Sequence, residues 1–398
     1  MLGGALEKIV NYLYDYNKTI IMTKKIYEKS TVSVVICTRN RSDYLKKCLI
    51  SLLNQSYQPK EIIIVNDDPE KNFSVYNFFK NEFQEFTDKL IKLLDGIDII
   101  LIKNKNNSGI VASRNTGIMV ASGDIVAFCD DDGFAHKNWL KNLVKNYKDN
   151  KILGVGGPVI EIGRNIKTPK RPITKLAYIK NGKIVTNYRI KKLKEIHYLP
   201  KKFVPFLQGG NMCFRRDALL QIKGGDTNLT GNCYREETDL CLRIAKKGKL
   251  LFEPYAITYH DTAKKGGCRD IINFDLNKFF YYMFRNTTYF FFKHFSIKKA
   301  FNFTLNSISR QIKLLQKDKT GLTRDYLKIT NKRNHSKSII FGSFEGFYSW
   351  FKSWRRELEM MCTIPTSINC FKLVFIGGIF KIVEIDNKTN FIKKLFGL

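Results

Sequence analysis

Four short runs of apolar, mostly β-branched residues lie in the first third of the chain, and polar residues end most of them. Each run has the length of a strand, and segments with apolar residues at helical spacing lie between them. Strands that alternate with helices predict a parallel sheet with helices on both faces. Runs without polar alternation suit strands that are buried on both sides. The four runs cover residues 32–37, 62–65, 97–102 and 125–129.

Polar residues follow three of these runs directly. In open parallel sheets, ligands bind at the carboxyl ends of the strands. The polar ends should therefore converge on one edge of the sheet, as a nucleotide site requires. These ends hold residues 38–41, 66–68 and 130–132.

Composition and patterning divide the chain into three parts. Residues 1–30 form a polar and aromatic lead-in, residues 31–264 contain the alternating strands and helices, and residues 265–398 shift to Phe, Tyr, Asn and Lys. We predict an α/β domain for the middle part and a mainly helical extension for the last. Residues 160–205 predict a loop or a small hairpin. Helical spacing predicts helices over residues 44–53, 73–86, 115–121 and 239–247.

The charge of the chain is strongly positive, because its 398 residues include 68 basic and 36 acidic ones, a formal +32. Such an excess indicates a polyanionic partner, either nucleic acid, anionic lipid or a phosphate-rich ligand. A solvated Lys-rich surface is the alternative. The nine cysteines include no C-x-x-C pair, so we expect neither a zinc site nor disulfides, and a reducing cytoplasmic compartment fits best. The start of the chain lacks a signal-peptide pattern, and no run reaches the roughly 18 apolar residues of a membrane-spanning helix.

Three adjacent carboxylates, Asp130, Asp131 and Asp132, follow the fourth apolar run. Adjacent carboxylates repel, so they stay ionised together only where a cation compensates them. Residues two apart in extended chain point the same way, so Asp130 and Asp132 can share a face. Mg²⁺ and Mn²⁺ prefer such oxygen ligands and bridge them to substrate phosphates. For the triplet alone, a solvated acidic turn is the alternative.

Four further residues carry groups suited to chemistry. Arg114 offers a guanidinium fork for phosphate oxygens, or else a surface salt bridge. Glu236 and Glu237 precede a predicted helix, where the helix dipole alone favours acidic residues. One carboxylate aimed into a cleft could instead deprotonate an acceptor hydroxyl. His260 is a lone histidine, which is more often structural than a ligand.

The order of these segments resembles glycosyltransferase family 2, the large inverting family of nucleotide-sugar transferases with the GT-A fold. Asp130-Asp131-Asp132 is similar to the D-x-D motif of the family, and Glu236-Glu237 stands where the family usually has Glu-Asp. The resemblance covers roughly residues 31 to 262 and rests on motifs in family-like order and spacing. The other segments that carry it are residues 32–41, 61–68, 107–117, 122–124, 209–216 and 259–260.

The resemblance implies a role for each matching position. Asp132 would bind the metal, and His260 would be an additional ligand of the metal or of the phosphate. Mg²⁺ or Mn²⁺ is the expected cofactor. Glu237, one methylene longer than the Asp of the family, would be the catalytic base, with Glu236 as the alternative. The implied substrate-binding residues are Thr38 and Asn40 at the nucleoside, Asp67 at the base, Arg114 at the base or diphosphate, Asp130 at the ribose, and Asp131, Asn211 and Asp239.

The implied reaction is a single in-line displacement that inverts the anomeric carbon. The expected donor is a UDP-sugar, and the expected acceptor is a hydroxyl of a glycan or a lipid-linked molecule. No Gln-x-x-Arg-Trp motif is present, so we expect single sugar additions.

Two other classes stay open, namely a non-catalytic protein of the same fold and a sugar-nucleotide pyrophosphorylase. The second class normally has a Gly-rich phosphate loop near its first strand, and residues 32–41 contain no Gly. A nucleic-acid-binding protein would explain the charge but neither acidic motif, so no nucleic-acid partner is expected.

The last part of the chain interleaves aromatic and basic residues, mainly over 279–293 and 347–356. Rings and cations together suit the headgroup boundary of a membrane that contains anionic lipids. We therefore expect a peripheral enzyme at the cytoplasmic face of a membrane. The alternative is a helical extension whose aromatic residues pack on the catalytic domain as a second core.

Overall fold

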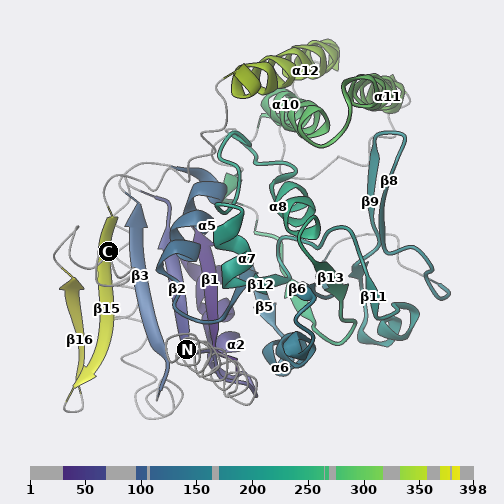
Figure 1. Cartoon of the computed structure of the whole chain (residues 1–398). Coiled ribbons are helices and arrows are strands. Elements are labelled where there is room, and N and C mark those ends of the chain that lie inside the picture. The colour runs from purple at the N-terminus through teal and green to yellow at the C-terminus, as the bar shows by residue number, and fades with distance from the viewer. Residues whose placement is uncertain are drawn as a thin grey trace, which may run out of the picture.

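The four apolar runs of the sequence form adjacent strands at the centre of the molecule (Figure 1). The computed structural model describes residues 30–68, 96–104, 108–163, 170–263, 265–268, 275–316, 332–355, 368–376 and 379–385. The central strands are β1 (Val32–Thr38), β2 (Glu61–Asn66), β3 (Asp98–Asn104) and β4 (Ile125–Asp130). They lie in the order β4-β1-β2-β3 and are parallel, so the predicted α/β sheet is confirmed there.

Antiparallel neighbours extend this sheet on both sides, which the sequence patterns do not predict. On the β4 side the added strands are β12 (Met212–Arg215), β6 (Ile152–Gly156), β13 (Lys249–Phe252) and β11 (Lys202–Phe203). On the β3 side they are β15 (Ile368–Ile376) and β16 (Ile379–Ile385). β12 is antiparallel to β4, and β15 is antiparallel to β3. The region beyond residue 265 therefore contributes two strands to the main sheet.

A smaller sheet brings the lone histidine of the motif to the acidic triplet. Its strands are, in order, β10 (Arg189–Ile190), β7 (Val159–Glu161), β14 (Thr258–His260) and β5 (Gly133–Ala135). The pairing of β14 with β5 sets His260 opposite Gly133, the residue after Asp132. The pairing with β7 sets Glu161 opposite His260 on the other side. The small hairpin predicted within residues 160–205 is present as β8 (Ala177–Lys180) and β9 (Lys183–Thr186).

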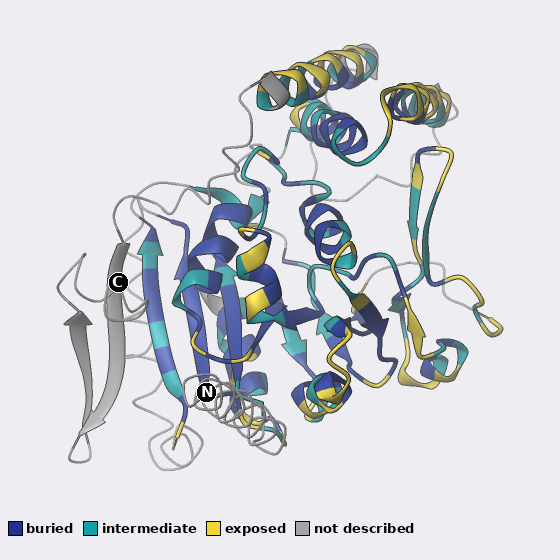
Figure 2. Ribbon diagram, viewed as in Figure 1, coloured by how far each residue is buried: buried dark blue, intermediate teal, exposed yellow. Residues whose placement is uncertain are grey.

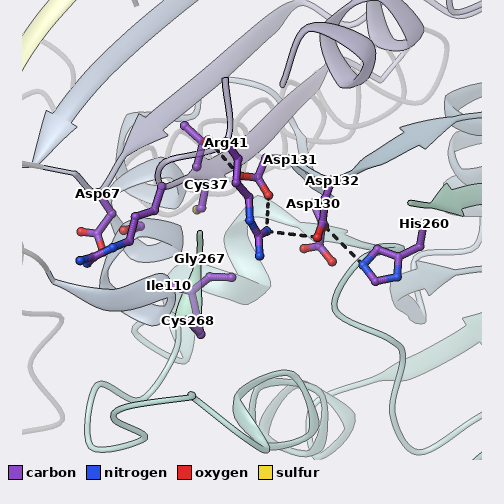
Figure 3. Close-up of a pocket in the computed structure, with 13 residues that line it drawn as sticks. Cys37, Arg41, Asp67, Ile110, Asp130, Asp131, Asp132, His260, Gly267 and Cys268 are labelled. Atoms are coloured by element: carbon purple, nitrogen blue, oxygen red, sulfur yellow. Dashed lines mark hydrogen bonds and ion pairs between the residues drawn. The ribbon is translucent and has the colours of Figure 1, made fainter. Parts of the chain in front are cut away.

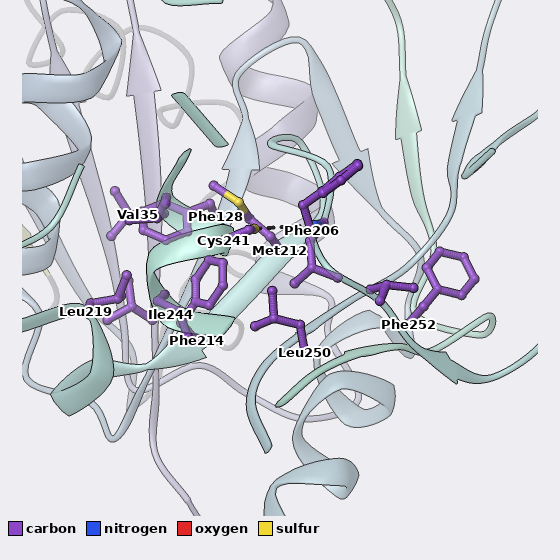
Figure 4. Close-up of a cluster of buried hydrophobic side chains, with 14 of the residues drawn as sticks. Val35, Phe128, Phe206, Met212, Phe214, Leu219, Cys241, Ile244, Leu250 and Phe252 are labelled. Atoms are coloured by element: carbon purple, nitrogen blue, oxygen red, sulfur yellow. Dashed lines mark hydrogen bonds between the residues drawn. The ribbon is translucent and has the colours of Figure 1, made fainter. Parts of the chain in front are cut away.

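Helices cover both faces of the central sheet, because successive residues of a strand point to opposite sides. These helices are α2 (Ser42–Leu53), α5 (Gly109–Val120), α6 (Trp139–Val144), α7 (Arg216–Gln221) and α8 (Glu236–Ala245), with 3₁₀ segments at Lys145–Lys148 and Leu193–Tyr198. Val34 and Ile36 of β1 belong to the core that includes α2 and α6. Val35 belongs to the opposite core with Phe128, Phe214 and residues of α7 and α8 (Figure 4).

Three helices confirm the predicted helical extension, namely α10 (Leu276–His294), α11 (Ile297–Gln316) and α12 (Lys332–Arg355). Most aromatic side chains of α10 are buried, as the second-core alternative requires. A buried ion cluster also anchors α10, because Lys293 Nζ lies 2.6 Å from Asp226 and 2.7 Å from Asp239. None of the helices in the described part of the chain is long and apolar enough to cross a membrane.

The sequence patterns place the central strands well but miss the starts of two helices. α5 begins at Gly109, before the predicted start at residue 115. α8 begins at Glu236 instead of residue 239, so both glutamates lie in its first turn. The predicted helix over residues 73–86 and the lead-in up to residue 29 lie outside the described residues.

Candidate active site

The ends of the central strands line a cavity, called here the first cavity (Figure 3). Thr38 ends β1, Asp67 follows β2, and the three Asp residues stand at and after the end of β4. His260 of β14 lines the same cavity from the smaller sheet. Residues 267 and 268, beyond the expected domain boundary, also line it. The convergence expected from the sequence is therefore present in the structure.

Asp67 joins the end of β2 to the start of α5. Its Oδ1 accepts hydrogen bonds from Asn104 Nδ2 at 2.8 Å and from the backbone N–H of Ser108 at 2.9 Å. Its Oδ2 accepts from the N–H of Gly109 at 2.9 Å, and the side chain lines the first cavity. A buried carboxylate at a helix start satisfies N–H groups that the helix itself leaves open. Asp67 thus links β2 to α5 through hydrogen bonds and also lines the first cavity.

Asp131 is tied to the protein through both of its oxygens. Thr38 Oγ1 donates to Oδ2 at 2.9 Å, and Arg41 Nη1 donates to Oδ1 at 2.7 Å. Arg41 Nη1 also lies 3.2 Å from Asp132, and Arg41 donates to the carbonyl oxygens of residues 265 and 266. Burial raises the pKa of Asp131 to about 6, although the Arg41 charge opposes this shift. The middle carboxylate therefore anchors Arg41, which in turn holds the loop after residue 264.

Asp130, Asp132 and His260 form the candidate metal site. One ligand atom from each lies within 4.8 Å of the others, which no other group of such residues in the described chain achieves. His260 Nε2 lies 3.3 Å from Asp132 Oδ1, and its Nδ1 lies 3.1 Å from Glu161 Oε2. A carboxylate on the far ring nitrogen orients a ligating histidine. Two carboxylates and one imidazole suit a divalent cation such as Mg²⁺ or Mn²⁺.

This arrangement shifts the pKa values of His260 and Asp132. Burial lowers the pKa of His260, but its hydrogen bonds to Asp132 and Glu161 outweigh that effect and raise the pKa to about 10. Burial acts to raise the pKa of Asp132, but the hydrogen bond from His260 and the charge of Arg41 hold it below its usual range. The site therefore keeps Asp132 ionised and attracts a positive charge, either a proton on the ring or a metal ion.

A second cavity adjoins the first, and the two share Asp130 and His260 in their walls. Arg114 of α5 lines it and forms a buried ion pair with Glu236 Oε1, while its Nη2 lies 3.3 Å from Asp130 Oδ1. Arg114 thus links the acidic triplet to the start of α8. The candidate metal ligands lie at the junction between the two cavities.

Glu236 and Glu237 both line the second cavity but differ in environment. Glu236 is buried, and this burial raises its pKa to about 7 against the opposing charge of Arg114. Glu237 is less buried, and no hydrogen bond or ion pair engages it among the described residues. Of the two carboxylates, Glu237 is the one left available to an incoming molecule.

A glycine allows the chain to pass close to the acidic triplet. A Cβ at Gly210 would lie 2.6 Å from Asp130 Oδ2, closer than non-bonded atoms approach. The segment after β11 can therefore line the second cavity beside Asp130 only without a side chain at this position.

Two residues that the sequence assigns to the substrate are not brought to either cavity. Asn211 is fully buried, donates to the carbonyl oxygens of Pro158 and Ala256, and accepts from Trp139 Nε1 at 2.9 Å. Asp239 is also fully buried, and its oxygens bind Arg243, Lys293 and His294. In this structure protein groups engage both side chains, so the substrate roles of Asn211 and Asp239 stay predictions. Both residues stand beside motif positions in sequence, but their side chains point into the core.

Asn40 has a left-handed backbone with φ of 55°. Its neighbours Arg39 and Arg41 line the first cavity, whereas Asn40 is absent from the described walls of both cavities. The turn at the end of β1 therefore presents the flanking arginines instead of the asparagine.

Sequence reasoning missed three residues that shape these cavities. Arg41 stands in the polar end of the first strand, and this position indicated that it would lie near the site. The sequence did not predict its ion pairs with Asp131 and Asp132. Arg189 lines the second cavity and binds Glu161 at 2.9 Å, and nothing in the sequence around it indicates this. With the Gln208 amide oriented by its hydrogen bonds, Gln208 accepts from Arg189 Nε at 3.0 Å.

Comparisons with known proteins agree with this arrangement. Residues 33–222 match the family model described as glycosyl transferase family 2. The chain is 28% identical over 221 residues to the glucosyl-dolichyl phosphate glucuronosyltransferase of Haloferax volcanii, covering 54% of this chain and 63% of that protein. It is 35% identical over 114 residues to the uncharacterized glycosyltransferase YwdF of Bacillus subtilis, covering 29% of this chain and 37% of that protein. The chain thus spans less than two thirds of the length of these relatives.

Among solved structures, the mannosyltransferase PcManGT from Pyrobaculum calidifontis, in complex with GDP-Man and Mn²⁺, is 14% identical and has a TM-score of 0.47. That match covers 81% of this chain and 88% of the other, and likeness at this level carries no inference about function. The segment that matches the family model contains the three Asp residues, Asp67 and Arg114 in the geometry described above. Residues 33–222 therefore match glycosyltransferase family 2, and they lie in an α/β domain whose central strands are parallel.

Proposed function

We propose that the protein is an inverting, metal-assisted glycosyltransferase that moves a sugar from a UDP-sugar to a hydroxyl group. One observation carries the proposal: two cavities meet at Asp130 and His260, with a candidate metal site at their junction. The first cavity, at the strand ends, would take the nucleoside. The diphosphate would lie at the junction, and the sugar and acceptor would enter the second cavity.

Asp130, Asp132 and His260 would hold Mg²⁺ or Mn²⁺. The ion would neutralise the charge that builds on the departing diphosphate. Thr38 and Asp67 line the first cavity, where they would contact the nucleoside. Arg114 lies between Asp130 and Glu236, where its charge can stabilise the diphosphate or fix the two carboxylates in place.

We assign the role of catalytic base to Glu237. The acceptor oxygen attacks the anomeric carbon, the bond from that carbon to the diphosphate oxygen breaks, and the diphosphate leaves with the electron pair. The acceptor proton passes to Glu237, and the anomeric configuration inverts. Glu237 suits this role because it lines the second cavity and has no partner among the described residues, whereas Glu236 is held by Arg114.

A lipid-linked acceptor is part of the proposal, with a glycan as the other acceptor class. The name of the Haloferax volcanii relative describes a glucosyl-dolichyl phosphate, which is a lipid-linked sugar. An enzyme with such an acceptor would work at the cytoplasmic face of a membrane, and the basic extension supports contact with anionic lipid.

The test is a donor screen with purified protein. UDP-, GDP- and dTDP-sugars are supplied in turn, and release of the nucleoside diphosphate is followed with Mn²⁺, with Mg²⁺ and with EDTA. We expect release from a UDP-sugar that EDTA abolishes. Formation of a nucleoside triphosphate from pyrophosphate would identify a pyrophosphorylase instead. Binding of UDP without turnover of any donor would identify a non-catalytic protein.

A further inference from the structure

α12 exposes more large apolar side chains than an ordinary surface helix does. Such a helix turns its large apolar residues toward the core and its polar residues toward solvent. α12 buries one large apolar residue, Ile339, beside His335, Gly342, Ser343 and Gly346, and it exposes several other large apolar side chains (Figure 2). α10, in contrast, buries most of its aromatic side chains.

Two glycines at a spacing of four explain how α12 docks in this orientation. A Cβ at Gly342 would collide with the carbonyl oxygen of Tyr281, and one at Gly346 would collide with that of Arg285. The two helix backbones therefore touch directly, as small-x-x-x-small pairs allow. Phe347 and Trp350 of α12 still pack against Phe292 of α10. Phe341, Phe344 and Tyr348 lie on the outside of α12.

The exposed side chains form one continuous stripe along α12, called here the α12 face. Phe341, Phe344 and Tyr348 are 64%, 70% and 56% exposed, although each is large and apolar. Their spacing of three and four residues places them on one side of the helix. The α12 face consists of Lys337, Ile340, Phe341, Phe344, Tyr348 and Lys352. α11 carries a second stripe of exposed residues at Ile297, Phe301 and Leu305.

Exposed aromatic residues in a continuous row are rarely left in water, and they mark a surface that something covers. The charge of the helices narrows the choice of partner. α11 and α12 together contain nine basic residues and one acidic residue, a formal +8. A second copy of the chain would bring an equal positive charge to the same face and be repelled. An anionic lipid surface complements the charge and also accepts the rings at its headgroup boundary.

We propose that the α12 face inserts its aromatic side chains into the headgroup region of a membrane that contains anionic lipids. The rings would enter the boundary between headgroups and acyl chains, while Lys337 and Lys352 at the two ends of the stripe would meet lipid phosphates. The stripe lies along one side of a helix, so α12 would rest parallel to the membrane surface.

The packing of α10 connects this face to the second cavity. Arg285 of α10 donates to Ser349 Oγ of α12 at 3.0 Å and to the carbonyl oxygen of Asn228 at 2.6 Å. Asn232 Nδ2 donates to the carbonyl oxygen of Phe279 at 3.2 Å, and Asn232 lines the second cavity. One helix layer thus separates the α12 face from the wall of the cavity. Attachment through α12 would hold this cavity near the lipid, which suits the lipid-linked acceptor of the proposed function.

The test compares full-length variants in binding to vesicles. The triple variant Phe341→Ser, Phe344→Ser, Tyr348→Ser removes the centre of the α12 face. The control variant Phe203→Ser, Tyr255→Ser removes two aromatic side chains that are 48% and 58% exposed elsewhere on the molecule. Each protein is co-sedimented with vesicles of phosphatidylcholine and phosphatidylglycerol, and with vesicles of phosphatidylcholine alone.

We expect the wild type and the control to bind the anionic vesicles, less at high salt. The triple variant should bind them at least about tenfold more weakly, because transfer of even one phenyl ring from water is worth that factor. Equal binding by the triple variant, or no binding by the wild type, would overturn the proposal. A dimer in sedimentation velocity that only the triple variant dissociates, without vesicle binding, would identify a second copy as the partner instead.

UDP binding, measured by calorimetry on the same proteins, separates this proposal from the proposed function. The three proteins should bind UDP alike, which also shows that the variants are folded. Vesicle binding without UDP binding would leave the α12 face intact as a membrane surface and refute the proposed donor.

Discussion

The two neighbouring glutamates at the start of α8 should respond differently to the same substitution. Glu237→Gln keeps the shape of the side chain but removes its ability to accept a proton. A general base contributes about 10²–10⁴-fold to turnover, so we expect a loss in that range. Donor binding and stability should change little, because no described residue depends on Glu237 for a hydrogen bond or an ion pair.

Glu236→Gln should act mainly on stability. The variant keeps an amide oxygen that can accept from Arg114, but it removes the charge, so Asp130 at 3.3 Å is the one ion-pair partner left to Arg114 among the described residues. Removing one partner of a buried ion pair costs about 3–5 kcal/mol, since the remaining charge stays out of water. Because Glu236 keeps 7% of its surface exposed, we place the expected loss at the lower end of that range, at about 3 kcal/mol.

Two measurements on each variant distinguish these roles. The rate of UDP release from the donor found in the screen reports catalysis, and urea unfolding reports the free energy of unfolding. The expected pattern is a slow but stable Glu237→Gln protein and a destabilised Glu236→Gln protein. A stable Glu236→Gln protein without activity, beside an active Glu237→Gln protein, would move the base to Glu236 and refute the reasoning from burial.

Three further substitutions test the metal site and the anchoring of α10. Asp132→Asn should abolish transfer without unfolding the protein, because the amide keeps its shape but loses the charge that attracts the ion; activity retained in EDTA would contradict this. Gly210→Ala should raise the metal concentration needed for half-maximal rate, because its Cβ would lie 2.6 Å from Asp130 Oδ2, and a metal titration measures this. Asp239→Asn should lower the free energy of unfolding at neutral pH by about 3–5 kcal/mol, because it leaves Lys293 and Arg243 short of a buried anion. Burial acts to raise the pKa of Asp239, but the charges of Lys293 and Arg243 hold this pKa below the ordinary value of 3.8. The wild type should therefore lose this stabilisation as the pH falls below 3.8. Equal acid sensitivity of the wild type and the variant in urea titrations would contradict the assignment.

The central strands could be predicted because their signal is local. Residues 32–37 and 125–129 are apolar without alternation, and strands that are buried on both faces require that pattern. The edge on which the polar ends converge follows from the parallel topology alone. For this reason Thr38, Asp67 and Asp130 could be brought to one place from the sequence, without knowledge of their contacts. His260 stands in the smaller sheet, and only the family resemblance placed it beside Asp132.

The direction of individual side chains could not be predicted, because it depends on partners far away in the chain. Asp239 lies close to the glutamates in sequence, yet its partners Lys293 and His294 come from α10. Arg189 reaches the second cavity from a short strand that no periodicity marks. The antiparallel strand β15 likewise joins β3 from the far end of the chain.

The burial of individual aromatic residues in the extension could not be predicted from the sequence either. Phe290 and Phe344 both have Phe and Tyr among their neighbours in the sequence, but the first is fully buried and the second is 70% exposed. The difference comes from the glycines of α12, which fix the side that meets α10. The second-core reading therefore applies to α10, and α12 supplies the exposed face on which the proposed membrane contact rests.

The structure shows where part of the positive charge of the chain lies. Around the junction of the cavities, Arg41 and Arg114 are neutralised by Asp131, Asp132 and Glu236, so the active site itself has no surplus of positive charge. A diphosphate would enter beside Asp130 and Asp132 only with a cation to balance these carboxylates, which is why the transfer should depend on metal. The excess of basic residues lies elsewhere, and nine of these residues belong to α11 and α12, the helices that carry the exposed apolar stripes. Basic residues and exposed aromatic side chains therefore occur together on the helices that would face the lipid. The diphosphate of the donor would instead be balanced by the metal ion.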